Sequence, residues 1–258
     1  PVRDRSTWEF YRERMTPGDL WPQERIAEAC EPYREREKPL AVHLGGTWGV
    51  MRSMMGPERA CTILYDDPAL VEEIHEWMLW VSVTYRFPLM EKLRPEIVTA
   101  WEDLSYNHGM LISPAHFERF CIPAYRAFAE IADACNADMA TIDSDGNVME
   151  LVPLVADAGM NCMHPFEVKG RNDLFALRER LPHFIMMGWL EKEVINEGNE
   201  QMIEAEILSK VPALLEKGCY FPNGDHGIQP LATFANLCKF MALLHEVCGN
   251  PEGEFPRV

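Results

Sequence analysis

The chain has 258 residues, of which 47% are hydrophobic and 25% are charged, a composition typical of a soluble globular protein with a sizeable core. Its formal net charge of −17 argues against nucleic acids and anionic membrane surfaces as partners, because both bind clustered lysine and arginine. No apolar run reaches the roughly 18 residues that a membrane-spanning helix requires, so we expect a cytoplasmic protein without a membrane segment.

The cysteines and the first residues also bear on where the protein works. Eight cysteines are scattered along the chain without a Cys-x-x-Cys pair, which predicts reduced, buried, structural thiols. The chain begins at Pro1 without an initiator methionine or an apolar signal region. We therefore expect that the natural N-terminus is missing.

Residues 1–39 form a charge-dense N-terminal segment with interspersed aromatic side chains. Turn signals at Pro17-Gly18 and Pro22 divide this segment, which predicts short surface helices. From residue 40 the pattern changes to an alternation of strands and helices.

The first strand–helix–strand sequence has clear boundaries. Residues 40–44 form an apolar run closed by two glycines, which is typical of a buried parallel strand. Asp67 and Pro68 then fit the N-cap and the first position of a helix whose apolar residues recur at helical spacing to residue 85. Residues 97–101 form the second predicted strand.

The same alternation continues to the end of the chain. A helix that opens at Ser113-Pro114 is expected to break at Pro123, because proline cannot donate to the preceding turn. The other predicted elements are strands at residues 138–142, 161–166, 184–188 and 219–222, and helices at residues 148–159, 173–181, 203–215 and 234–244.

Strands that alternate with helices predict a parallel sheet, either doubly wound or closed into a barrel. No strand is followed by Gly-x-Gly-x-x-Gly, which disfavours a dinucleotide-binding fold. Six strands and a missing start favour an α/β (β/α)8 barrel that lacks its first one or two strands. We expect one barrel domain over residues 1–258, with the βα repeats in residues 40–250.

Polar residues follow nearly every predicted strand. In a βα barrel the active site forms at the C-terminal ends of the strands, so these residues are expected to share one mouth. They are His43, Glu102, Asp103, Asp143, Asp145, Asn147, His164, Glu167, Glu191, Lys192, Asp225 and His226.

Asp143 and Asp145 are the most suggestive pair in this set. Two carboxylates two residues apart can share a cation or a proton, and with His226 they would form a site for zinc or another divalent ion. Asp145-Gly146-Asn147 also fits a simple turn that caps the next helix.

The two histidines differ in their surroundings. His164 lies between apolar neighbours, which fits a packed, hydrogen-bonded core residue as well as it fits a residue of a functional site. His226 lies in Asn223-Gly224-Asp225-His226-Gly227, where two glycines allow the backbone to approach a ligand closely. Asp225 beside it could orient the imidazole.

Taken together, these segments resemble the uroporphyrinogen decarboxylase superfamily over about residues 40–250. This superfamily includes the decarboxylase and the cobalamin-dependent methyltransferases, and the resemblance implies a (β/α)8 barrel. The motifs that carry it are Tyr65-Asp66-Asp67-Pro68, Trp101-Glu102-Asp103, Gly109 to Pro114, Asp143-Ser144-Asp145-Gly146, His164-Pro165-Phe166-Glu167, Gly188 with Lys192, and Pro222 to Pro230.

The resemblance to the methyltransferase branch places acidic residues where that branch binds zinc. Members that act on thiols hold zinc with His-x-Cys and a later Cys, and Asp143 and Asp145 fall where the first two would be. Asp225 or His226 falls near the third. Oxygen ligands leave zinc more Lewis-acidic and less suited to delivering a thiolate, which favours an O-methyl or N-methyl substrate.

The resemblance therefore implies first a demethylase of a small methylated compound that works with a corrinoid carried by a partner protein. In this reading Asp143, Asp145 and His226 bind zinc, Asp103 joins them in catalysis, and the substrate is oriented by His43, Glu102, Asn147, His164, Glu167, Lys192 and Asp225.

Two other readings stay open. One is a cofactor-free decarboxylase of uroporphyrinogen or a similar acid, in which Asp143 or Asp145 would stabilise a protonated pyrrole and His226, which matches the family's late histidine, would contact a carboxylate. The arginine-rich N-terminal segment of that branch has no match here. The other is an inactive barrel that binds a small molecule. A homodimer is compatible with each reading.

Overall fold

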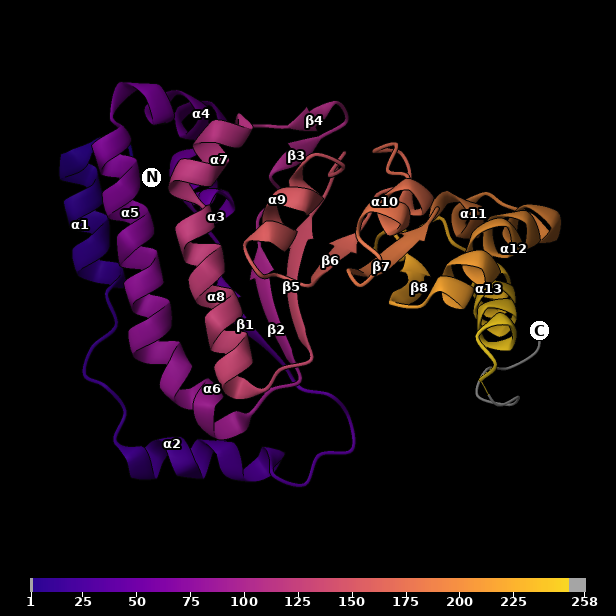
Figure 1. Ribbon diagram of the computed structural model, residues 1–258, viewed down its shortest axis with the longest axis horizontal. Coiled ribbons are helices and arrows are strands. Elements are labelled where there is room, and N and C mark those ends of the chain that lie inside the picture. Colours follow the sequence, from indigo (N-terminus) through magenta and orange to yellow (C-terminus); the bar gives the residue numbers. More distant parts are fainter. Residues whose placement is uncertain (1, 251–258) are drawn as a thin grey trace. The chain divides into compact units, whose positions relative to one another are not determined.

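The computed structural model describes residues 2–250 (Figure 1). These residues fall into two compact units, each of which is described by itself. The N-terminal unit contains residues 2–104, 110–143 and 151–161, and the C-terminal unit contains residues 105–109, 144–150 and 162–250. Each unit has three parallel strands that alternate with helices, so the predicted α/β class and the six predicted parallel strands are confirmed.

The N-terminal unit begins with the predicted surface helices and continues through the first three parallel strands. Its elements are α1 (Arg5–Met15), α2 (Gln23–Cys30), the short 3-10 helix η1 (Glu31–Tyr33), β1 (Ala41–Gly45), α3 (Trp48–Met55), α4 (Pro57–Asp66), α5 (Pro68–Val81), the π-helical turn η2 (Ser82–Arg86), α6 (Phe87–Leu93), β2 (Ile97–Trp101), α7 (Pro114–Phe120), α8 (Ile122–Cys135), β5 (Met139–Ser144) and α9 (Leu151–Asp157). A two-stranded sheet of β3 (Ser105–Tyr106) and β4 (Gly109–Met110) follows β2.

Strand β2 lies between β1 and β5, and the registers pair Ala41 with Ile97 and Trp101 with Asp143. This pairing brings the C-terminal ends of β2 and β5 to the same edge of the sheet. Helix α8 runs lengthwise beside these strands, and α5 lies beside α8 (Figure 1). Large side chains such as Phe117 from α7 are fully buried in this unit.

Local sequence signals account for the helix boundaries. The Asp67 carboxylate accepts a 3.0 Å hydrogen bond from the Leu70 amide, so the predicted cap of α5 is confirmed. The predicted break near Pro123 is also confirmed, because α7 ends at Phe120 and α8 restarts at Ile122 with the proline in its first turn.

Helix α5 buries a histidine. The Nδ1 atom of His75 lies 2.8 Å from the Phe120 carbonyl oxygen, and the side chain is 6% exposed. A carbonyl can only accept, so Nδ1 carries the proton and donates it. Burial lowers the pKa of His75 to about 4, which keeps the ring neutral near neutral pH.

The C-terminal unit contains β6 (Cys162–Pro165), α10 (Leu174–Arg180), β7 (Ile185–Leu190), α11 (Glu193–Asn196), α12 (Glu200–Lys217), β8 (Tyr220–Gly224) and α13 (Phe234–Val247). Strand β7 lies between β6 and β8, with Cys162 paired to Ile185 and Leu190 paired to Gly224. The end of β7 therefore lies beside the end of β8, and the loops that follow them start from neighbouring positions.

The helices and thiols bear on two of the sequence predictions. No helix within residues 2–250 is long and apolar enough to cross a membrane. All eight cysteines are free, as predicted, and five of them are buried. The prediction of burial is wrong for Cys219, which is exposed although it precedes the apolar residues Tyr220 and Phe221.

Candidate functional site

The loop that follows β8 carries Asp225 and His226, which meet two further ionisable side chains of the C-terminal unit. The Asp225 amide donates a 2.7 Å hydrogen bond to the Leu190 carbonyl, which extends the pairing of β7 and β8 by one residue. His226 is the next residue, and no atom lies within 4 Å of the position that a Cβ on the following Gly227 would take. We call Asp145, Lys192, Asp225 and His226 the His226 cluster.

Asp225 is fully buried and is held by backbone donors. Its carboxylate accepts hydrogen bonds from the Val168 amide at 2.9 Å and from the Lys192 amide at 3.3 Å. The Lys192 ammonium nitrogen lies 3.8 Å from the same carboxylate. A buried carboxylate needs such donors and a nearby cation to offset its lost hydration. Asp225 therefore fixes its neighbours in place and is not itself open to a ligand.

His226 is oriented by contacts on both ring nitrogens. Nε2 lies 3.1 Å from the Asp145 carboxylate, and Nδ1 lies 3.3 Å from the Lys192 ammonium and 3.7 Å from the Asp225 carboxylate. An ammonium can only donate, so Nδ1 accepts from Lys192 and the proton of the neutral ring sits on Nε2, where it is donated to Asp145. The half-buried His226 thus joins a lysine to a carboxylate.

The loop that carries Asp145 is held by side chains that the sequence had suggested for substrate. Glu167 accepts a 3.1 Å hydrogen bond from the Gly146 amide, and the Asn147 side chain donates to the Gly170 carbonyl at 2.8 Å. A Cβ on Gly146 would lie 2.7 Å from the backbone of Ser105, and its φ of +80° disfavours other residues. The turn thus depends on glycine, and Glu167 and Asn147 shape the loop.

Glu102 of the N-terminal unit is buried at the start of α3. Its carboxylate accepts from the Thr47 amide, from the Thr47 hydroxyl at 2.8 Å and from the Gly49 amide at 2.8 Å. These groups lie at the N-terminus of α3, where backbone donors have no partner within the helix. Glu102, which follows β2, therefore caps α3. Burial raises the pKa of Glu102, and the hydrogen bonds from Gly49 and Thr47 oppose that rise.

Asp103 follows Glu102 with a left-handed backbone, at φ +49°. Its carboxylate forms a 3.0 Å ion pair with Arg52 of α3. A carboxylate oxygen of Asp143, at the end of β5, lies within 4.8 Å of one of Asp103. The two predicted residues are therefore brought together within the N-terminal unit, where Arg52 offsets their charge. Nothing in the sequence pattern singled out Arg52.

Two further predicted residues lie on strands of different units. His43 on β1 is exposed, and its Nδ1 lies 3.2 Å from the Thr99 hydroxyl. Desolvation and the nearby Arg86 lower the pKa of His43. His164 is half-buried on β6, two residues after the buried Cys162. Their predicted roles toward a substrate stay predictions.

Two atoms of the His226 cluster, His226 Nε2 and an Asp145 carboxylate oxygen, are separated as two ligands of one metal ion would be. Two ligands each about 2.0–2.1 Å from a tetrahedral zinc ion are about 3.3 Å apart. The 3.1 Å between His226 Nε2 and the Asp145 oxygen is close to that separation. Asp225, 3.7 Å from Nδ1, stands where a carboxylate commonly orients a metal-bound histidine. Asp143 belongs to the other unit, so its part in such a site stays a prediction.

Comparison with known proteins adds one finding. The family model described as Uroporphyrinogen decarboxylase (URO-D) matches residues 15–247, which is most of the chain. Among curated proteins, no sequence matches the chain.

Proposed function

The chain belongs to the uroporphyrinogen decarboxylase family, and we propose that it is a metal-assisted demethylase of a small O-methyl or N-methyl compound. The methyl acceptor is the reduced corrinoid of a partner protein. The observation that carries this proposal is the pairing of His226 Nε2 with the Asp145 carboxylate at 3.1 Å, backed by the buried Asp225.

In this proposal the bond between the methyl carbon and its oxygen or nitrogen breaks, and the electron pair stays on the heteroatom. The methyl group forms a new bond with the corrinoid, and the heteroatom takes up a proton. A divalent ion, when bound, would act as a Lewis acid that makes the heteroatom a better leaving group.

The residues of the chain have separate tasks in this scheme. Asp145 and His226 hold the ion, which requires that the Nε2 proton move to Nδ1. Asp225 is the acceptor that would stabilise this form of the ring, because its carboxylate lies 3.7 Å from Nδ1. The Lys192 ammonium then loses its hydrogen bond to Nδ1, keeps its contact with Asp225 and would be a cation for an anionic part of the substrate.

A second candidate, decarboxylation of uroporphyrinogen or a similar acid without a cofactor, is favoured by a different observation. The contact of Lys192 with Nδ1 puts the proton on Nε2, and a protonated Nε2 is a hydrogen-bond donor rather than a ligand. In that reaction a carbon–carbon bond breaks, carbon dioxide leaves, and the electron pair left on carbon takes a proton. His226 and Lys192 would contact a substrate carboxylate.

Metal analysis of the intact protein, followed by two turnover assays, separates these candidates. We expect about one zinc or other divalent ion per chain, and formation of the methylated corrinoid from free reduced cobalamin and a panel of methyl ethers and methylamines. Absence of metal together with loss of carboxyl groups from uroporphyrinogen would support the second candidate. Absence of both reactions would leave a binding protein.

Substitution of the two acidic residues tests the site. Asp145→Asn keeps the shape of the side chain but removes the charge, so metal binding should weaken at least about tenfold, or about 1.4 kcal/mol. Asp143→Asn should do the same if both carboxylates bind the ion. Asp157→Asn, at the end of α9, is the matched control and should leave the metal content unchanged. Normal binding in the Asp145 variant would contradict the proposed site.

A further inference from the structure

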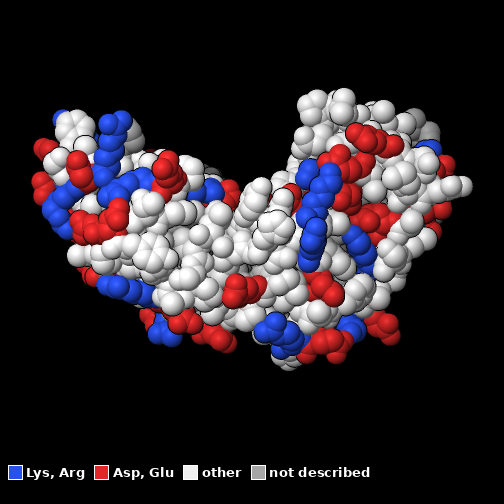
Figure 2. All heavy atoms as spheres, turned by 90° about the horizontal axis from the view of Figure 1, so that it is seen from above, with Lys and Arg blue, Asp and Glu red and all other residues white. Residues whose placement is uncertain are grey.

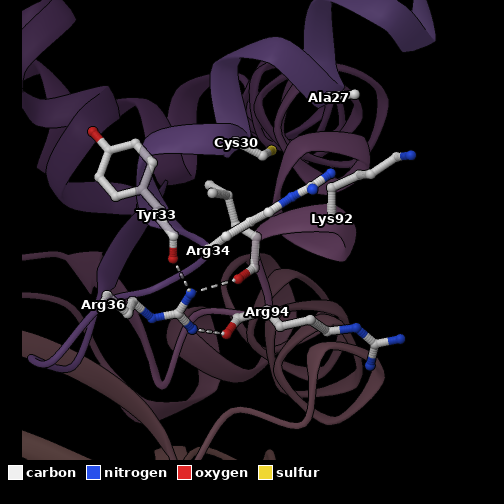
Figure 3. Close-up of a pocket in the computed structure, with 8 residues that line it drawn as sticks. Ala27, Cys30, Tyr33, Arg34, Arg36, Lys92 and Arg94 are labelled. Carbon is white, nitrogen blue, oxygen red and sulfur yellow. Dashed lines mark hydrogen bonds between the residues drawn. The ribbon is translucent and has the colours of Figure 1, made fainter.

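The N-terminal unit has a pocket of about 290 Å³ whose charged lining is entirely basic. It lies between the end of α2, the turn η1 and the end of α6, before strands β1 and β2 begin. Four of the residues that line it are Arg34, Arg36, Lys92 and Arg94, and no acidic residue lines it (Figure 3). This is unusual in a chain with 41 acidic and 24 basic residues.

One of the four cations is part of the framework. The Arg36 guanidinium donates to the carbonyls of Tyr33, Leu93 and Arg94 at 3.0, 3.1 and 2.6 Å (Figure 3). It also forms an ion pair with Glu96. The hydrogen bonds of Arg36 lower the pKa of Glu96 to about 2. Arg36 therefore joins the segment before β1 to the segment before β2 and has little capacity left for a ligand.

The other three cations form fewer contacts with the protein than Arg36 does. Arg34 pairs with Glu31 at 2.9 Å in an exposed contact, which is easily exchanged. Arg94 donates one hydrogen bond to the Ala134 carbonyl, and within residues 2–250 neither Arg94 nor Lys92 forms an ion pair. On the face drawn in Figure 2, by contrast, basic side chains mostly lie next to acidic ones.

The backbone holds these two cations at the pocket. Arg94 ends α6 in the left-handed conformation at φ +49°, and Arg36 binds its carbonyl oxygen. Lys92 lies in the last turn of the same helix. The hydrogen bond from Arg36 therefore fixes the backbone at Arg94, and the side chains of Lys92 and Arg94 are exposed at the pocket.

We propose that this pocket binds the phosphate group of a small anion. Two cations without ion pairs match the charge of a phosphate dianion, and arginine and lysine are the side chains that recognise phosphate oxygens. The volume exceeds that of one phosphate, which leaves room for the small organic group of a phosphomonoester. The ligand would bridge η1 and α6, at the opposite end of the strands from Asp103 and Asp143.

Isothermal titration of the intact protein tests this proposal, with inorganic phosphate and glycerol 3-phosphate as probes and chloride used to hold ionic strength constant. We expect saturable binding of at least one probe. A tighter phosphomonoester would assign a phosphorylated metabolite, and equal affinities would assign free phosphate; both outcomes support a phosphate site.

Lys92→Gln and Arg94→Gln should each weaken binding about tenfold, and the double variant more. Arg126→Gln is the matched control, because Arg126 is an exposed arginine on α8 outside the pocket, and it should change the affinity less than twofold. Thermal unfolding without ligand checks that all variants fold. Absence of saturable binding to about 10 mM of either probe, or equal losses in the control, would overturn the proposal.

Discussion

The buried His75 gives a quantitative prediction for the pH dependence of stability. Its pKa is lowered from 6.5 to about 4 by burial, so the folded chain binds fewer protons than the unfolded chain between these values. The free energy of unfolding must therefore fall as the pH falls through this window. The shift of about 2.5 pKa units corresponds to about 3.4 kcal/mol below pH 4, and to about 2 kcal/mol between pH 7.5 and pH 5.

The variant His75→Asn isolates this contribution. The asparagine amide can replace Nδ1 as donor to the Phe120 carbonyl, which lies 2.8 Å from the ring, but it does not titrate. Urea unfolding at pH 7.5 and pH 5 should therefore show a decrease about 2 kcal/mol smaller in the variant than in the parent chain. His183→Asn, at an exposed histidine, is the control and should leave the decrease unchanged. The same pH dependence in parent and His75→Asn would refute the reasoning.

Two more predictions concern buried contacts. Glu102→Gln places an amide group against the Thr47 or Gly49 donors, so the free energy of unfolding should fall by about 2–4 kcal/mol. Urea unfolding measures this loss, with Glu118→Gln at an exposed glutamate as the control. A loss below about 1 kcal/mol would contradict the capping role of Glu102. Gly188→Ala would bring a Cβ to 1.9 Å from the Pro165 carbonyl at a φ of +109°, so its melting temperature should fall by several degrees, whereas Gly227→Ala, with open space around it, should melt near the parent.

The strand positions could be predicted because each strand is a short apolar run with a turn signal on either side. Residues 97–101 were predicted as a strand and form β2, and the Asp67 cap of α5 follows from the chemistry of aspartate and proline at a helix start. Helices α3 and α4 were not predicted, although Gly56 at the end of α3 and Pro57 at the start of α4 are helix boundary signals.

The candidate site was less predictable, because its contacts join residues far apart in the chain. The position of Glu102 after a strand suggested a ligand to substrate, and only the fold shows that its carboxylate is used by the start of α3. The proximity of His226 to Asp145 and Lys192 likewise depends on the pairing of β7 with β8 and on the turn at Gly146. Spacing along the sequence carries no information of this kind.

The hydrogen bonds of Asp225 also have a consequence for the diversity of such sites. One carboxylate ties the loop after β6, through Val168, and the loop after β7, through Lys192, to the loop after β8. Substitution of other side chains in these three loops can change what the loops recognise, while the hydrogen bonds of Asp225 keep the loop backbones in place. A library that randomises the loop residues and retains Asp225 should therefore contain more folded members with altered selectivity than one that randomises Asp225 as well.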